Sequence, residues 1–132
     1  MNALETVQAY YQCFNNQDWA GMLALLVPDI RHEVNQGEAQ VGIEAFSAFL
    51  RHMDQCYDEK LSDFTYFVEP KAEKVAVEFT VTGVYKQTDG NLPAANGQTY
   101  VLPVGAFLEV KAGRITRVTN YYNLPLWIQL VS

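Results

Sequence analysis

DIRHEVNQGEAQVGIEAFSAF, residues 29–49, holds the two patterns that decide the fold. Its first half places the polar side chains of His32, Glu33 and Asn35 in an extended, strand-like pattern, and its second half begins a helix at Gly42. Polar groups held between two apolar elements lose part of their contact with water, and burial and neighbouring charges shift pKa values toward neutrality. The sequence therefore predicts that a functional site includes this strand.

Helical patterns precede this stretch. Apolar side chains at three-four spacing predict a helix over residues 3–16. A second, shorter helix is expected over Trp19–Leu26, because Asp18 is a good N-cap and Pro28 prevents continuation. The expected strand Ile30–Gln36 follows these two helices.

The remainder of the chain changes from helical to strand periodicity. Apolar residues at three-four spacing predict the longest helix over residues 43–57, whereas apolar and polar residues alternate from Leu61 onward. The expected strands, separated by turns and by the loop QTDGNLPAANG, are Leu61–Val68, Val75–Tyr85, Tyr100–Leu108 and Arg114–Tyr122. Helices followed by a run of strands predict an α+β fold, a curved antiparallel sheet with three helices packed on one face.

Composition limits the classes of protein that this chain can represent. A length of 132 residues with 49% hydrophobic and 18% charged residues predicts one domain, residues 1–132, with a substantial core. A net charge of −6 without a basic run argues against nucleic acid and anionic membrane surfaces as partners. The N-terminus has no early Lys or Arg, so we expect a cytoplasmic protein, in which Cys13 and Cys56 are reduced core thiols.

Motifs for cofactors and metals do not occur in the sequence. Neither HExxH nor a cysteine cluster is present, and no GxGxxG or Walker sequence follows a strand, so neither a metal ion nor a nucleotide cofactor is expected. His52 lies on a flank of the predicted third helix beside Arg51, where a solvated or half-buried position is expected.

The order of elements resembles the nuclear transport factor 2-like superfamily. The chain is similar within it to ketosteroid isomerase-related and SnoaL-type polyketide cyclase-like proteins, and the specific segments are HEVNQGEAQVGIEAFSAFL and GRITRVTNYYNLPLWIQLV. The resemblance implies a cone-shaped cavity between sheet and helices, commonly within a dimer. It also implies a range of activities that includes isomerases, cyclases, hydrolases, dehydratases and binding proteins, so the fold alone does not assign the function.

The resemblance can be carried over residue by residue. It places Tyr10 at the oxyanion-donor position of ketosteroid isomerases, and it places either Val34 or Glu33, depending on the register, at the position of their general base. Gly105 falls where those enzymes have a protonated Asp, and Tyr122 where SnoaL-type cyclases have an acid/base Asp. The resemblance therefore implies that classical steroid isomerisation is absent or very weak.

Strand geometry leaves two alternatives for the base. Side chains alternate between the faces of a strand, so His32 shares a face with Val34, and Glu33 shares the other face with Asn35. Either His32 or Glu33 could act as the base with Tyr10 as the donor. The residues expected to contact the substrate are Asn35, Tyr85, Tyr100, Tyr122 and Trp127.

Two functions follow from these candidates. The first is a cofactor-independent acid/base enzyme of the isomerase, cyclase or hydratase type that acts on a small apolar molecule. The second is a non-catalytic ligand-binding or assembly module of the same fold. Strands with apolar residues on both faces, such as Tyr100–Leu108, predict in addition a homodimer formed through the outer face of the sheet.

Overall fold

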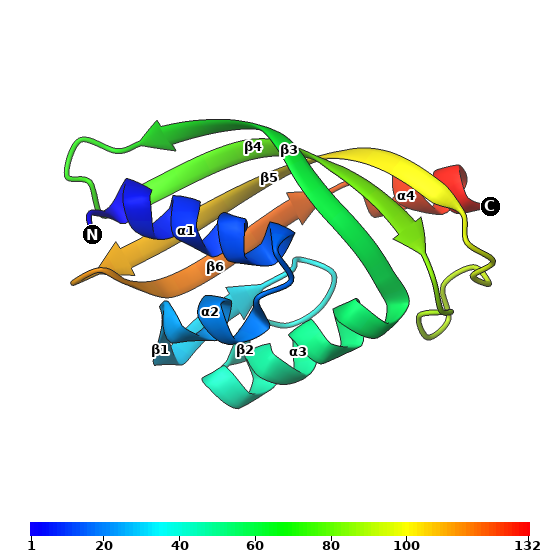
Figure 1. Ribbon diagram of the computed structural model, residues 1–132, viewed down its shortest axis with the longest axis horizontal. Helices are drawn as coiled ribbons and strands as arrows, with labels where there is room; N and C mark the ends of the chain where they lie inside the picture. The colour runs from blue at the N-terminus through cyan, green and yellow to red at the C-terminus, as the bar shows by residue number, and fades with distance from the viewer.

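The computed structural model describes all of residues 1–132 and contains one curved sheet with helices on its concave face (Figure 1). In chain order, the elements are α1 (Ala3–Asn15), α2 (Trp19–Ala24), β1 (Leu26–Glu33), β2 (Gln40–Val41), α3 (Ile43–Cys56), β3 (Tyr57–Val68), β4 (Lys74–Tyr85), β5 (Thr99–Lys111), β6 (Arg114–Tyr122) and α4 (Leu124–Val131). The prediction of an α+β fold with a curved sheet and helices packed on it is confirmed.

The sheet has the strand order β2-β1-β6-β5-β4-β3. Its pairs are antiparallel except β1 with β6, which run parallel, so the expectation of a wholly antiparallel sheet is wrong for this pair. The two-residue turn Ala112-Gly113 sends β6 back along β5, and both turn residues have positive φ, as a tight hairpin turn requires. β6 then lies against β1, and a parallel pair of this kind needs a long connection.

The first strand begins earlier than its sequence pattern suggests. α2 ends at Ala24, and β1 already begins at Leu26 and passes through Pro28, which was expected only to end the helix. Proline fits because the pairing of β1 with β6 is irregular between Leu26 and Arg31, where no ladder hydrogen bond requires its missing N–H. The strand ends at Glu33, so Asn35, at positive φ, lies in the following turn.

The fourth helix, α4, is an addition to the three that the sequence predicts. The Asn123 side chain caps it by accepting a hydrogen bond from the Leu126 N–H, and Pro125 lies in its first turn, where a missing N–H costs nothing. The helix brings Trp127 against Tyr85 and Tyr100, with ring centroids 4.9 and 5.9 Å apart.

The core lies between the helices and the concave face of the sheet. Side chains alternate between the two faces of a strand, and this alternation supplies the sheet's part of the core. β4 shows it most clearly: alternate residues from Val75 to Tyr85 are buried, and their neighbours face outward. Tyr11 of α1 packs against Phe64 and Phe79 of the sheet.

Cys13 and Cys56 are both free thiols, and only Cys56 is fully buried. None of the helices has the length and apolar character that crossing a membrane would require.

Candidate functional site

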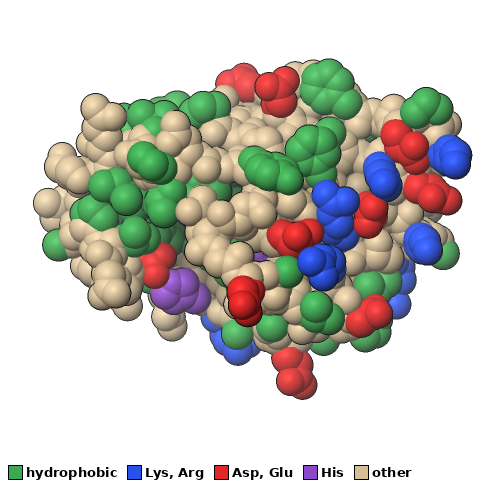
Figure 2. All heavy atoms as spheres, turned by 180° about the vertical axis from the view of Figure 1, so that it is seen from behind, with side chains coloured by type: hydrophobic (Ala, Val, Ile, Leu, Met, Phe, Trp, Pro, Cys, Tyr) green, Lys and Arg blue, Asp and Glu red, His purple; other side chains and the backbone are tan.

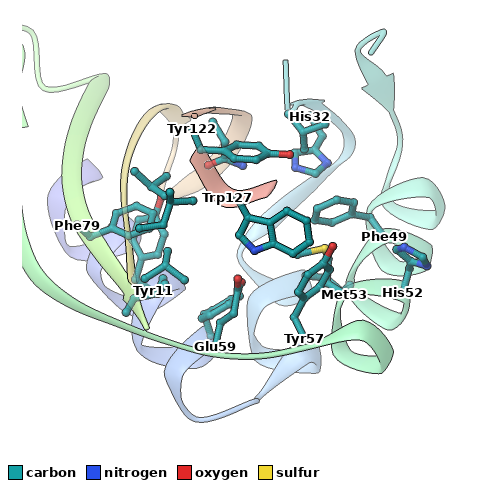
Figure 3. Close-up of a pocket in the computed structure, with 18 of the residues that line it drawn as sticks. Tyr11, His32, Phe49, His52, Met53, Tyr57, Glu59, Phe79, Tyr122 and Trp127 are labelled. Atoms are coloured by element: carbon teal, nitrogen blue, oxygen red, sulfur yellow. The ribbon is translucent and has the colours of Figure 1, made fainter. Parts of the chain in front are cut away.

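A cavity of about 260 Å³ lies between the concave face of the sheet and the helices (Figure 3). Eighteen of its 23 lining residues are hydrophobic. The whole lining comes from all four helices, from β1, β3, β4, β5 and β6, and from loop residues that include Val34 and Leu92. Its volume is just below the roughly 300–1,000 Å³ of typical small-molecule sites. The cavity therefore suits a small, largely apolar ligand.

His32 faces the cavity from β1. Its side chain is buried, and its ring packs against Phe46 and Phe49 of α3 with centroids 4.5 and 4.6 Å apart. Because these surroundings remove water from the ring, burial lowers the pKa of His32 to about 4. The imidazole is therefore uncharged near neutral pH. Val34 lines the cavity on the same side of the chain.

Glu33 lies on the opposite face of β1 and does not line the cavity. The Thr119 hydroxyl donates a 3.0 Å hydrogen bond to its Oε1, and Arg31 and Arg117 lie 3.4 and 3.6 Å from the same oxygen. The hydrogen bond from Thr119, followed by the arginine charges, holds the pKa of Glu33 below its ordinary value. Of the two alternatives for this strand, the His32 face is the one that lines the cavity.

Glu59 is a carboxyl group in the cavity that the sequence interpretation overlooked. It lies on β3, and the Tyr100 hydroxyl donates a 2.6 Å hydrogen bond to its Oε2. Burial among apolar side chains raises the pKa of Glu59, and the hydrogen bond from Tyr100 opposes part of that effect. The sequence does carry a signal for Glu59. Because β3 begins at Tyr57 rather than at Leu61, the alternation of inward and outward side chains along the strand already includes Glu59.

Gly83 determines where the Tyr100 ring can lie. The two residues are direct partners in the β4–β5 ladder. A Cβ atom added at Gly83 would lie 2.4 Å from Tyr100 Cζ and 2.5 Å from its hydroxyl. Only glycine therefore leaves the Tyr100 ring room to cross β4 and reach Glu59.

Two adjacent tyrosines of α1 contribute to the cavity wall. Tyr10, the predicted donor, is buried and lines the cavity, and burial raises its pKa. Tyr11, which the sequence interpretation overlooked, also lines it. The Tyr11 hydroxyl is the one buried side-chain polar atom without a hydrogen-bond partner, and leaving such a group unpaired costs about 1–3 kcal/mol.

The remaining predicted ligand contacts divide into two groups. Tyr122 and Trp127 line the cavity, and the Tyr122 ring extends toward His32 (Figure 3). Asn35, Tyr85 and Tyr100 do not line it. Instead, Asn35 Nδ2 donates to the Asn120 carbonyl at 2.8 Å. The Tyr85 hydroxyl donates to the Pro93 carbonyl at 2.7 Å, which fixes the loop between β4 and β5.

A polar cluster forms one edge of the cavity, where α3 meets that loop. The half-exposed His52 ring lies 2.7 Å from Asp89 Oδ1, and the Tyr57 hydroxyl donates a 2.7 Å hydrogen bond to Asp89 Oδ2. All three residues line the cavity. Sequence patterns could not indicate this cluster, because Asp89 lies in a loop more than 30 residues away from its partners.

Comparison with families and solved structures gives a consistent result. A family model described as a SnoaL-like domain matches residues 7–118. No curated protein matches the chain significantly. A crystal structure from Pseudomonas putida KT2440, named as a proposed polyketide cyclase, is 49% identical with a TM-score of 0.97, and the match covers 100% of this chain and 99% of that one.

Two further structures extend the comparison. A second proposed polyketide cyclase, from Xanthomonas campestris pv. campestris, is 52% identical with a TM-score of 0.95 over 98% of this chain and 96% of that one. A nuclear transport factor 2-like protein of unknown function from Burkholderia pseudomallei K96243 is 22% identical, with a TM-score of 0.84 over 100% and 98% of the two chains. At that identity, the last match shows the fold alone.

Proposed function

The chain belongs to the SnoaL-like domain family, and we propose on this basis that it is an enzyme that moves a proton on a small, largely apolar molecule bound in the cavity. The relatives that are 49% and 52% identical are named as proposed polyketide cyclases, which supports a carbonyl-containing, mostly carbocyclic substrate. The reaction would be of the isomerase, cyclase or hydratase type.

The observation that carries this proposal is the position of Glu59. A carboxyl group in an apolar cavity is a better base near neutral pH than one in water, because burial raises its pKa. The Tyr100 hydroxyl donates its hydrogen bond to Oε2 of Glu59, which leaves Oε1 of Glu59 as the oxygen that can accept a proton from a ligand. Glu59 is therefore the general base in this proposal.

His32 takes a different role from the one first expected. A buried imidazole with a pKa of about 4 is a weak base near neutral pH, so it accepts a proton poorly in comparison with Glu59. As an uncharged ring on the cavity wall it can form a hydrogen bond to a substrate oxygen. We assign His32 to orienting the substrate together with Tyr122.

In the proposed reaction, Glu59, Tyr10 and Tyr11, which all line the cavity, share one proton transfer. Glu59 takes a proton from a carbon beside the substrate carbonyl, and the electron pair of the broken C–H bond moves into the carbonyl and gives an enolate. The hydroxyls of Tyr10 and Tyr11 donate hydrogen bonds to the developing oxyanion, and one such donor typically contributes about 10²–10³ in rate. Protonated Glu59 then returns the proton to the same or another carbon.

Hydrogen–deuterium exchange tests the proposal without knowledge of the natural substrate. The protein is incubated in D₂O with a panel of small cyclic ketones, and NMR follows the loss of protons beside the carbonyl. We expect catalysed exchange on at least one ketone that also displaces a hydrophobic fluorophore from the cavity. Glu59→Gln should abolish the exchange and keep the binding, whereas Glu33→Gln, on the outer face, should keep both.

A non-catalytic binding module is the second candidate. Val34 lines the cavity, and in one of the two registers of the resemblance it stands where ketosteroid isomerases have their base, which favours the alternative. Fluorophore binding together with exchange no faster than in Glu59→Gln across the panel would select the binding module. Exchange that persists in Glu59→Gln but disappears in His32→Ala would move the base to His32.

We further propose that two copies associate through the outer face of the sheet. Figure 2 shows hydrophobic side chains there beside a band of acidic and basic ones. Val101 and Phe107 are 60% and 47% exposed, and the Phe107 ring lies edge-on to Tyr121 at 5.6 Å. A lone domain rarely exposes such aromatic surface, and the mixed charges of the band allow the same surface to pair with itself.

A further inference from the structure

We propose that His52, Cys56 and Asp89 form a binding site for a divalent transition-metal ion, best matched by Zn²⁺, at the edge of the cavity. The side chains offer one imidazole nitrogen, one thiol sulfur and one carboxylate oxygen, and these donor atoms all lie within 4.8 Å of one another. The proposal does not depend on proton transfer by Glu59, which takes no part in the cluster.

The distances between the donors are close to those that a tetrahedral ion requires. Zn²⁺ bonds of about 2.0–2.3 Å separate nitrogen, oxygen and sulfur donors by roughly 3.3–3.6 Å. In the structure, His52 Nε2 lies 2.7 Å from Asp89 Oδ1 and 4.0 Å from Cys56 Sγ. Side-chain rotations that move each donor by about 1 Å would therefore give tetrahedral geometry, and His52 is half exposed and free to make such an adjustment.

The backbone already holds the two ligand-bearing segments together. His52 and Cys56 are four residues apart, one turn along α3, and therefore share a face of the helix. The Cys56 carbonyl accepts hydrogen bonds from the N–H groups of Lys86 and Gln87, at 2.8 and 3.3 Å. These bonds fix the start of the loop that carries Asp89 against the end of α3. The backbone of both segments is therefore already in place when an ion binds.

The Asp89 carboxylate is oriented from two sides. The Tyr57 hydroxyl donates to Oδ2, which leaves Oδ1 directed at His52, and the Asp89 N–H donates to the Tyr85 hydroxyl at 2.9 Å. Metal-ligating carboxylates are commonly held by such a hydrogen bond, and its loss weakens metal binding by about 10–100-fold. Tyr57 is thus a positioning residue for the proposed site.

The donor set selects the class of ion. A thiolate and an imidazole favour Zn²⁺ and similar transition-metal ions over Mg²⁺ or Ca²⁺, which prefer oxygen ligands. Burial, and then the charge of Asp89, raise the pKa of Cys56, so an ion must displace the thiol proton to bind. Once it does, the thiolate and the carboxylate together balance the two positive charges of the ion. The nearby Lys86 ammonium donates to the Asp54 carbonyl at 2.6 Å.

Three protein ligands leave one tetrahedral position for water or a ligand oxygen. Since His52 and Asp89 line the cavity, that position would open toward it. The ion would also join α3 to the β4–β5 loop, which adds a link across the edge of the cavity. We therefore expect bound metal to stabilise the fold against heat.

Cobalt spectroscopy tests the site directly. The untagged, reduced protein is freed of metal with a chelator and titrated with Co²⁺, whose tetrahedral complexes absorb visible light and whose thiolate bond adds a charge-transfer band in the near ultraviolet. We expect one Co²⁺ per chain, displaced stoichiometrically by Zn²⁺. Cys56→Ser should abolish the charge-transfer band, and the matched control Cys13→Ser should retain it.

Two further variants distinguish the loss of metal binding from the loss of the fold. His52→Gln changes a half-exposed side chain and should weaken Zn²⁺ binding at least tenfold with an unchanged circular dichroism spectrum. Tyr57→Phe keeps all three ligands and should weaken Zn²⁺ binding about 10–100-fold. Absence of a tetrahedral spectrum, equal loss of the band in Cys13→Ser, or unchanged affinity in His52→Gln would each overturn the proposal.

Discussion

The Tyr100 hydroxyl, which lies outside the cavity, donates a 2.6 Å hydrogen bond to the carboxylate of Glu59, which lies within it. A short hydrogen bond to an ionised acceptor is stronger than one between neutral groups, and it fixes the carboxylate in one orientation. The proposed base is thus held in place by a residue that does not line the cavity.

Tyr100→Phe should raise the pKa of Glu59 further. Removing the donor takes away the one interaction that favours the ionised carboxylate, whereas the burial that disfavours it remains. Carbon-13 NMR titration of the glutamate carboxyl groups measures the change, and Glu33 serves as the internal reference because its pKa should not move. An unchanged Glu59 titration would show that the hydrogen bond does not act on the base.

Gly83→Ala should displace Tyr100 and reproduce part of that effect. The added methyl group would lie 2.4 Å from the Tyr100 ring, and such overpacking typically costs about 1–3 kcal/mol of stability. We expect a lower urea midpoint together with a raised Glu59 pKa. Gly37→Ala is the control, because nothing lies within 4 Å of a Cβ atom added there, and it should leave both properties unchanged. Full stability in Gly83→Ala would contradict this account.

Stability should fall as the pH drops from about 6.5 to 4, in part because of His32. The folded pKa of about 4 lies below the ordinary 6.5, so the unfolded chain binds the proton first and stability is lost through this window. The contribution is about 3 kcal/mol when integrated over the window. His32→Leu should flatten this part of the urea-unfolding profile. An equal slope in the parent protein and in His32→Leu would remove His32 as the cause.

Light scattering should give twice the monomer mass at micromolar concentration. Phe107→Glu places a charge in the exposed apolar surface of the outer face and should yield a monomer that retains its secondary structure. Leu130→Glu changes an exposed residue of α4 and should leave the dimer intact. A monomeric parent protein, or a dimer that survives Phe107→Glu, would contradict the proposed interface.

The elements that the sequence predicted best have strong periodicity over many residues. The three-four pattern around Phe46 and Leu50 defines α3 to within one residue, and the alternation from Val75 to Tyr85 defines β4 similarly. The family was also recognisable from the order of these elements and from two segments of sequence. α4 escaped prediction because its eight residues are nearly all apolar, so they lack a polar face, and because only Asn123 separates them from β6.

The site was harder to predict, because its polar groups converge only in three dimensions. His32 was identified from its own strand, but the choice between it and Glu33 depended on which face of β1 packs on α3. Glu59 was overlooked because a strand that directly follows a helix lacks the turn residues that usually mark its start. Asp89 lies in a loop without periodicity, so nothing local links it to His52.

The parallel pairing of β1 with β6 has a consequence for the order of folding. Glu33 and Thr119 meet across 86 residues of chain, whereas β3 to β6 are joined in succession by two turns and by the loop of residues 86–98. Contacts between distant residues form late, because closing a long loop costs entropy before any contact is gained. The wall that carries His32 is therefore completed only after the last strand is in place, and a nascent chain that ends before β6 lacks the lining residues Asn120, Tyr122, Leu124 and Trp127.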